Sequence, residues 1–344
     1  MKPWMIYGAN GFTGKHIAKR AKALGMKPIL AGRSDSVKAL ADELGFECRL
    51  FDLDDEKGVV EGLKGIYLVA HCAGPFSKTS RPMVDACIAG GVHYFDITGE
   101  IEVFEAIFKK DAYAKKAGVA LIPGMGFDVV PTDCLAKDLS EKLPNARRLE
   151  LAFGGDFQVS PGTSKTMLER AGNAGMIRKD GELVAAGNLS RKIPFPRWKK
   201  VAFSLPWGDV STAYRTTGIP NIVVYAATGR VQNLLLRSAV KLSGLIAAPE
   251  TQKMLHKAID RFVPGPSDEN MRTNRVEVWG RVEDDFGKSI EGILELCDSF
   301  LFTVESVILG VKKALENPPP SGAWTPSAAF GKNFVNEVNK CATG

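Results

Sequence analysis

A glycine-rich segment near the start of the chain has the spacing of a phosphate-binding turn. The segment Gly8-Ala9-Asn10-Gly11-Phe12-Thr13-Gly14 directly follows the apolar stretch Trp4 to Tyr7, and a helical apolar pattern begins near Thr13. Glycines there allow the backbone to approach a pyrophosphate, and the start of a helix offers free amides with a partial positive charge. This placement predicts a dinucleotide bound by Gly8, Asn10, Gly11, Phe12, Thr13 and Gly14; the alternative is an ordinary glycine-rich turn.

The residues after the second expected strand predict which dinucleotide binds. About 20 residues beyond the glycine segment, folds that bind NAD usually place an acidic side chain on the ribose hydroxyls. Here the chain reads Ala31-Gly32-Arg33-Ser34. A guanidinium pairs with a phosphate but cannot accept hydrogen bonds from hydroxyls, so Arg33 and Ser34 favour the 2′-phosphate of NADP. The alternative is that Arg33 is a surface charge, and Asp35 is the residue that could reverse the preference.

Two further strand ends carry residues suited to the same ligand. Asp52 ends the third expected strand, where a carboxylate could accept a hydrogen bond from the adenine amino group; the alternative is that it caps a helix starting near Glu56. The segment Cys72-Ala73-Gly74-Pro75 follows the fourth strand, at the carboxyl edge where ligands bind such sheets. Its small residues would admit the nicotinamide half of the cofactor; the alternative is a plain turn.

Acidic side chains beside glycine turns follow the fifth and sixth expected strands. They are Glu100 in the segment Asp96 to Glu100, and Asp128 and Asp133 in the segment Gly124 to Asp133. Such carboxyl groups could orient a substrate or move protons, and the alternative is that each caps the helix that follows it. The candidate proton donors are Asp128, Asp133, Lys165, Asp209 and Tyr214. For the stretch Pro206 to Tyr214, a structural turn and strand is the alternative.

These residues need a scaffold, and the first 125 residues alternate short apolar runs with amphipathic stretches. That rhythm is typical of a parallel sheet wrapped by helices, a doubly wound Rossmann fold. Strands are predicted near 4–7, 28–31, 47–51, 67–71, 94–97 and 119–122, and helices are predicted to start near Thr13, Val37, Glu56, Arg81 and Glu102.

The pattern changes after Pro123. Helices are predicted over 132–142, 164–174, 231–262 and 300–315, with a strand over 148–153 and a hairpin of 275–282 and 290–296. Such strand pairs suit an α+β substrate domain with a mixed or antiparallel sheet. We therefore predict an NADP-binding domain over 1–125, a substrate or catalytic domain over 126–298, and a carboxyl-terminal helix and tail, 299–344, that returns to the first domain.

Composition narrows the class of protein. The formal charge of +6 forms no basic stripe, and the six cysteines and four histidines show no metal-ligand spacing. We therefore predict free thiols, no metal and no nucleic-acid partner. The start of the chain shows no secretory pattern, which predicts a cytosolic protein. Arg237 and Lys241 interrupt the apolar stretch 231–248, so no transmembrane segment is predicted, while peripheral membrane contact and a homodimer stay open.

Seven ordered segments of the chain have counterparts in one known family. They are Gly8 to Gly14, Cys72 to Phe76, His93 to Glu100, Gly126 to Asp133, Pro206 to Tyr214, Val278 to Gly280 and Thr325 to Gly331. In these segments the chain resembles the saccharopine dehydrogenase-like oxidoreductases, which include the trans-acting enoyl reductases. The resemblance implies an NADP-binding Rossmann domain, an α/β substrate domain and a carboxyl-terminal segment that returns to the first domain.

Together these patterns predict an NADPH-dependent oxidoreductase. It would transfer a hydride to a polarised C=C, C=N or C=O bond of a small-molecule or acyl substrate held between the domains. The alternative from another class is a non-catalytic NADP-binding redox sensor that regulates a partner, because its first domain would have the same sequence features. A membrane-associated lipid-tailoring reductase with 231–248 as an interfacial helix is a third hypothesis.

Overall fold

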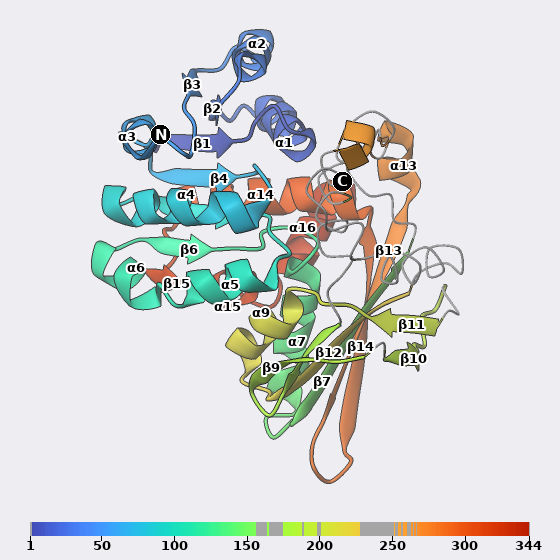
Figure 1. Ribbon diagram of the computed structural model, residues 1–344. Helices are drawn as coiled ribbons and strands as arrows, with labels where there is room; N and C mark the ends of the chain where they lie inside the picture. The colour runs from blue at the N-terminus through green and yellow to red at the C-terminus, as the bar shows by residue number, and fades with distance from the viewer. Residues whose placement is uncertain are drawn as a thin grey trace. The chain divides into compact units, whose positions relative to one another are not determined.

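The computed structural model describes residues 2–155, 164, 175–187, 189–197, 201–227, 251, 254–255, 257–259, 263, 265 and 267–343. The chain forms two compact units, Met1–Cys134 with Phe300–Gly344, and Leu135–Ser299. Each unit has a sheet of its own (Figure 1). Most of the helical segments expected over 164–174 and 231–262 lie outside the described residues.

The first unit contains a seven-stranded parallel sheet in the order β15-β6-β5-β4-β1-β2-β3. The strands are β1 (Trp4–Tyr7), β2 (Ile29–Gly32), β3 (Cys48–Leu50), β4 (Leu68–His71), β5 (His93–Asp96), β6 (Ala120–Ile122) and β15 (Gly322–Ala323). The central strands are buried throughout, as expected for a sheet covered on both faces. The strand order reverses between β1 and β4, which is where such sheets bind ligands. The predicted Rossmann fold is confirmed.

Helices cover both faces of this sheet (Figure 1). They are α1 (Phe12–Ala23), α2 (Asp35–Leu44), α3 (Glu56–Gly62), α4 (Phe76–Gly90), α5 (Ile101–Phe108), α6 (Asp111–Ala117), α14 (Ser299–Glu316), α15 (Pro326–Phe330) and α16 (Phe334–Thr343). On one face, strand side chains form a buried cluster with Val59 of α3, Cys87 of α4 and Ile107 of α5. On the other, the Phe95 ring of β5 meets Phe330 of α15 at 6.0 Å.

The carboxyl-terminal segment completes the first unit. Arg20 Nε of α1 forms an ion pair with the buried carboxylate of Glu305 on α14 at 2.6 Å. The hydroxyl of Tyr67 donates to the carbonyl of Ala314 at 3.2 Å. Strand β15 pairs with β6. Residues from the end of the chain therefore stabilise the sheet that its beginning forms.

The second unit contains a mixed eight-stranded sheet. Its strands are β7 (Arg148–Gly155), β8 (Met176–Lys179), β9 (Glu182–Ala185), β10 (Ser190–Lys192), β11 (Val201–Ser204), β12 (Asn221–Ala227), β13 (Arg275–Glu283) and β14 (Ser289–Cys297). The main order is β10-β11-β12-β7-β13-β14, in which β12 and β7 run parallel and the other neighbours antiparallel. The predicted mixed sheet is confirmed, and the expected hairpin is formed by β13 and β14.

Three described helices accompany the second sheet: the carboxyl-terminal part of α7 (Val130–Lys142), α9 (Asp209–Thr217) and α13 (Asp268–Thr273). Gly280 and Gly292 of the hairpin make room for α7, since a Cβ on either would come within about 3 Å of Leu135 or Leu139.

The strand alternative for Pro206 to Tyr214 is wrong, because these residues lead into α9, which ends at Gly218 in the left-handed conformation (φ 69°).

No helix in the described part of the chain combines the length and apolarity that crossing a bilayer requires.

Candidate cofactor site and active site

The glycine turn between β1 and α1 is closed by contacts that only glycine allows. Gly8 has a φ of 81°, and a Cβ there would lie 2.8 Å from the Cβ of Ala73. A Cβ on Gly14 would overlap the carbonyl oxygen of Gly8. The Gly8 amide donates to the carbonyl of Ala31 at 2.8 Å. These contacts hold the start of α1 against the ends of β1, β2 and the loop after β4.

The first turn of α1 presents unused backbone donors. The helix begins after Gly11 with no side-chain cap and no acidic residue in its first turn. Across the described residues, no group accepts a hydrogen bond from the amides of Phe12, Thr13 or Gly14. Free amides at the positive end of a helix form an anion site. This arrangement fits the pyrophosphate of a dinucleotide.

The turn from β2 to α2 brings a polar cluster beside the glycine turn. Asn10 Nδ2 donates to Ser34 Oγ at 3.2 Å and to Ser36 Oγ at 2.9 Å, and the two hydroxyls are 2.8 Å apart. Arg33 is exposed, and none of the described carboxylates forms an ion pair with it. Asp35 is also exposed, as the first residue of α2. Sequence reasoning missed Ser36, although a second serine so close to Arg33 was a usable signal.

Asp52, the expected adenine ligand, lies just beyond β3 and is partly buried. Its Oδ1 accepts from the amide of Asp54 at 3.1 Å. The alternative role as a helix cap is wrong, since Asp55 caps α3 by accepting from the amide of Lys57 at 3.1 Å. Burial first, and then the charge of Asp52, raises the pKa of Tyr7 to about 12, so this phenol stays neutral.

The segment Cys72-Ala73-Gly74-Pro75 is held from both sides. The amide of Cys72 donates to the carbonyl of Tyr7 at 2.8 Å, and the hydroxyl of Thr79 donates to the carbonyl of Ala73 at 2.6 Å. Burial raises the pKa of the Cys72 thiol to about 12, which keeps it protonated and a poor nucleophile. The segment thus offers a fixed backbone surface at the point where the strand order reverses.

Helix α4 begins at Phe76 and not near Arg81 as predicted. The buried carboxylate of Glu100 accepts from the amides of Phe76 at 3.0 Å and Ser77 at 2.9 Å, which stabilises the earlier start. Glu100 makes no side-chain cap on α5, the helix that follows it. The alternative that Glu100 caps the following helix is therefore wrong, and the residue organises the loop after β4 instead.

His71, the last residue of β4, is buried beneath that loop. Thr79 gives its hydroxyl hydrogen to Ala73, so its oxygen accepts from Nε2 of His71 at 3.1 Å. The tautomer is thereby set, and Nδ1 is an acceptor with no partner among the described groups. Burial lowers the pKa of His71 to about 3, so the imidazole is neutral and does not act as an acid.

Asp96 ties together the loops after β5 and β6. Its carboxylate accepts from the hydroxyl of Tyr94 at 2.8 Å and from the amides of Thr98 at 3.0 Å and Gly124 at 2.8 Å. The Thr98 hydroxyl in turn accepts from the amide of Glu100 at 3.1 Å. Burial raises the pKa of Asp96 to about 6 despite these hydrogen bonds. One polar network therefore fixes the carboxyl edge from the loop after β6 to the start of α4.

Asp128 lies at this same edge. A Cβ on Gly99 would be 2.9 Å from Oδ2 of Asp128, so the carboxyl group lies against the loop after β5. The neighbouring amide of Phe127 donates to Thr303 Oγ1 of α14 at 3.0 Å. Asp128 is partly buried, and burial raises the pKa of its carboxyl group to about 6. A partly exposed acid that titrates near neutrality is suited to proton transfer.

Asp133, by contrast, is fully buried within α7. Its Oδ2 accepts from the amide of Ser327 at 2.8 Å, so it stabilises the start of α15. The structure brings Asp128 and Asp133 into the unit that contains the glycine turn.

The other candidate proton donors do not belong to that unit. Asp209 is buried as the first residue of α9 in the second unit. Tyr214, on the same helix, is exposed, and the guanidinium carbon of Arg178 lies 4.2 Å from the centroid of its ring. Lys165 lies outside the described residues.

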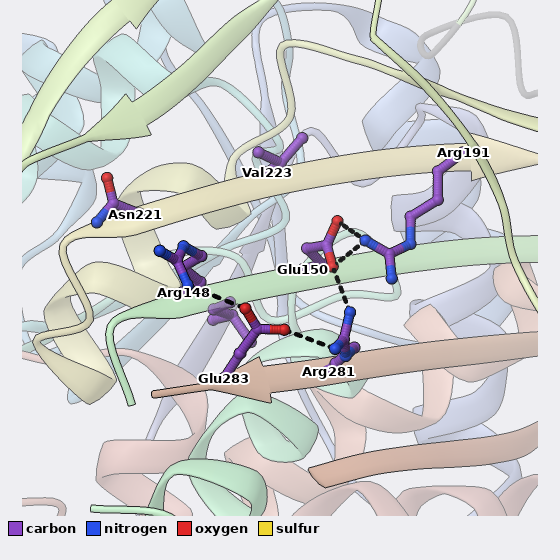
Figure 2. A pocket seen from close by; sticks show the side chains of 8 residues that line it. Arg148, Glu150, Arg191, Asn221, Val223, Arg281 and Glu283 are labelled. Carbon is purple, nitrogen blue, oxygen red and sulfur yellow. Dashed lines mark hydrogen bonds and ion pairs between the residues drawn. The ribbon is translucent and has the colours of Figure 1, made fainter. Parts of the chain in front are cut away.

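The second sheet carries a hollow lined by charged side chains. Figure 2 shows Arg148, Glu150, Arg191, Arg281 and Glu283 around it. Glu150 is shared by Arg191 and Arg281, and Glu283 is shared by Arg148 at 2.9 Å and Arg281 at 2.5 Å. The strand register produces this alternation, since Arg281 lies opposite Glu150 and Glu283 opposite Arg148. Every arginine that lines the hollow is therefore paired with a carboxylate.

Comparisons with known proteins find a matching family model and several relatives. Residues 4–122 match the family model described as the saccharopine dehydrogenase NADP binding domain. A saccharopine dehydrogenase-like oxidoreductase of Bos taurus is 28% identical over 251 residues, which cover 62% of this chain and 58% of that protein. A trans-acting enoyl reductase of Mycobacterium ulcerans (strain Agy99) is 30% identical over 142 residues, which cover 38% of this chain and 33% of that protein. Each match spans less than two thirds of the relative's own length.

A solved structure matches the chain over nearly its whole length. It is an apo histidine-tagged saccharopine dehydrogenase (L-Glu forming) from Saccharomyces cerevisiae, with a TM-score of 0.64, 13% identity, and coverage of 98% of this chain and 96% of that one. At this identity the likeness shows the fold alone. The domain match and the two relatives confirm the predicted resemblance, and the domain match confirms NADP as the cofactor.

Proposed function

Because residues 4–122 belong to the saccharopine dehydrogenase NADP-binding domain family, we propose that the chain is an NADPH-dependent oxidoreductase that reduces a polarised C=C, C=N or C=O bond. One observation carries the proposal. The carboxyl edge of the first sheet combines the unused amides at the start of α1, the unpaired Arg33 and the partly exposed acid Asp128. Such an edge offers donors for a dinucleotide and a proton for the substrate.

Each of several neighbouring loops would bind a different part of the cofactor. The amides of Phe12, Thr13 and Gly14 would hold the pyrophosphate, and Arg33 with Ser34 would pair with the 2′-phosphate. Asp52 would accept from the adenine amino group, and the segment Cys72-Ala73-Gly74-Pro75 would support the nicotinamide. When bound, NADPH supplies the hydride and leaves as NADP+. The protein's own contribution is to fix the position of the ring and to exclude alternative orientations.

The reduction also needs one proton for the second atom of the double bond. We assign it to the carboxyl group of Asp128, which burial keeps protonated to a higher pH than an ordinary aspartate. Asp133 suits the role less well, because it is fully buried and already accepts from the amide of Ser327. After donation, Asp128 is a carboxylate that recovers its proton from solvent.

We assign substrate binding to the expected domain 126–298, most of which lies in the second unit, Leu135–Ser299, and we assign the return to the first domain to 299–344. Lys165, Asp209 and Tyr214 stay candidates for contacts with the substrate. The names of the two relatives support an oxidoreductase but point to different substrates. We therefore propose the type of bond that is reduced, and no single compound.

A titration followed by a turnover assay tests the proposal. The purified protein is titrated with NADPH and with NADH at fixed salt, with nicotinamide fluorescence as the signal. It is then mixed with NADPH and with representative enoyl, imine and carbonyl compounds, and oxidation of NADPH is measured. We expect selective NADPH binding and oxidation with one class of compound. Selective NADH binding would overturn the assignment of Arg33, and binding without oxidation by any class would favour the redox sensor.

A further inference from the structure

Asn10 lies between two loops that would hold different parts of the cofactor. It belongs to the glycine turn, and a Cβ on Gly32 at the end of β2 would lie 3.5 Å from its Oδ1. Its Nδ2 reaches Ser34 and Ser36 at 3.2 and 2.9 Å. Through this one side chain, the turn that would hold the pyrophosphate is connected to the turn that carries Arg33.

The hydrogens of this cluster can be counted. Nδ2 of Asn10 donates to both serine oxygens. The hydroxyls of Ser34 and Ser36 lie 2.8 Å apart, so one of them donates to the other. One hydroxyl hydrogen is then left over, on a group that is open to solvent beside the unpaired Arg33. The cluster therefore has one hydroxyl donor in reserve for an anion.

We propose that Ser36 is a direct ligand of the cofactor's 2′-phosphate and that Asn10 is the positioning residue that holds Ser34 and Ser36 ready for it. The proposal deepens the proposed function, since it rests on NADP binding at this edge. Ser36 is exposed whereas Ser34 is half-buried, so we assign the hydrogen of Ser34 to the bond between the two hydroxyls and the free hydrogen to Ser36, which then replaces Ser34 as the hydroxyl donor to the phosphate. A phosphate oxygen between this hydroxyl and the Arg33 guanidinium would receive hydrogen bonds from both groups.

The cluster also bears on the choice between NADPH and NADH, because Asp35 by itself would favour NADH. A carboxylate at the start of α2 could accept from the free 2′-hydroxyl of NADH and would repel a phosphate. Arg33 and the reserve hydroxyl act in the opposite sense, because they donate to a phosphate. We infer that the selectivity for NADPH depends on these donors together, and that removing the hydroxyl of Ser36 lowers it without affecting the pyrophosphate site.

Binding measurements on matched variants test this inference. Dissociation constants for NADPH and NADH, and for 2′,5′-ADP by competition, are compared among the wild type, Ser36→Ala, Ser36→Thr and Asn10→Ala. Ser36→Ala should weaken NADPH and 2′,5′-ADP by about tenfold and leave NADH unchanged, and Ser36→Thr, which keeps the hydroxyl, should restore both. Ser289→Ala, at an exposed serine of β14, is the control and should change none of the three.

The role of Asn10 needs a double-mutant cycle. If Asn10 acts through the serines, Asn10→Ala should reduce the preference for NADPH, and it should add little in the Ser36→Ala background. Fully additive losses would overturn the positioning role. Should the wild type prefer NADPH while Ser36→Ala binds it equally well, the role of Ser36 is wrong and the proposed function stands. Equal binding of NADPH and NADH by the wild type would instead contradict the cofactor assignment itself.

Discussion

The carboxyl edge of the first sheet and the hollow on the second sheet both gather positively charged donors, but they differ in how those donors are paired. At the edge, Arg33 has no carboxylate partner and the first amides of α1 have no acceptor among the described residues. In the hollow, three arginines share the carboxylates of Glu150 and Glu283 (Figure 2). The number of arginines favours the hollow as an anion site, whereas the pairing favours the edge.

The pairing of the donors determines which of the two regions can bind an anion. An anion that enters the hollow would have to displace a carboxylate that already receives hydrogen bonds in a partly buried place, and it would also be repelled by the second one. An anion at the edge meets donors that no described residue uses, so it gains hydrogen bonds and displaces no carboxylate. We therefore treat unpaired donors, and not the density of cations, as the sign of the cofactor site.

The strongest test of this comparison places a carboxylate at the edge. Gly11 has a φ of −68°, which other residues adopt, and a Cβ there would meet only the Gly8 carbonyl at 3.2 Å. Gly11→Asp should weaken NADPH binding by more than about a hundredfold, because its charge would pair with the amides at the start of α1 and repel a pyrophosphate. Isothermal titration measures the loss.

Gly11→Asn is the control for that variant, since it has nearly the same size and no charge. It should retain more affinity than Gly11→Asp, and thermal unfolding should show that both variants fold. Equal affinity of the two would mean that bulk and not charge disturbs the turn, and unchanged NADPH binding by Gly11→Asp would contradict the pyrophosphate assignment.

A second test separates two kinds of carboxyl group. Arginines flank Glu150, whereas burial alone raises the pKa of Asp128 to about 6. If Asp128 donates the proton, turnover should fall as the pH rises through about 6, because its acid form disappears. Asp128→Asn should lower turnover by on the order of a hundredfold and abolish this pH dependence. Steady-state rates between pH 4.5 and about 8 provide the measurement, with NADPH binding as the control for structure.

Survival of the pH dependence in Asp128→Asn would move the role to another group with a similar pKa. Asp96 is the obvious one, because burial raises its pKa to about 6 as well. Its hydrogen bonds from Tyr94 of β5 and from the loops after β5 and β6 make a structural role the expected one.

A third test replaces one arginine in each region by aspartate. Arg33→Asp should weaken NADPH by about tenfold or more and NADH far less, because only NADPH has a 2′-phosphate for the new carboxylate to repel. Arg148→Asp, in the hollow, should leave the affinity for both cofactors unchanged. Fluorescence titrations of the two variants under one salt concentration decide the matter. A similar loss for NADPH and NADH in Arg33→Asp would remove Arg33 from the phosphate site.

The parts that the sequence could predict are those set by neighbouring residues. The buried strands from Trp4–Tyr7 onward, the glycine turn and the hairpin of β13 and β14 follow from apolar runs and turn residues within a short window. The start of α4 could not be predicted in this way, because Glu100 determines it from 24 residues away. The hydrogen bond of Asp133 could not be predicted from its neighbours either, because its partner Ser327 is 194 residues along the chain.

The polar details of the candidate site were predictable only in part. Arg33 and Ser34 could be predicted because they directly follow an expected strand. Ser36 could not, because its proposed role depends on a hydrogen bond from Asn10, which lies 26 residues earlier. The hollow was not predicted at all, since its alternating charges come from strands that are paired only in the folded sheet, such as Glu150 with Arg281.

The smallest expected effect is also the most direct test of the comparison, because it should turn the hollow into an anion site. Glu150→Gln removes the carboxylate that Arg191 and Arg281 share, while Glu283 still pairs with Arg281. The variant should lose about 1–3 kcal/mol of stability to urea, and sulfate should restore part of it by binding to the unpaired arginine. Glu295→Gln, which breaks an exposed ion pair with Arg197, should show neither effect. If sulfate stabilises the wild type as much as Glu150→Gln, then pairing with carboxylates does not prevent anion binding in the hollow, and the distinction between the two regions fails.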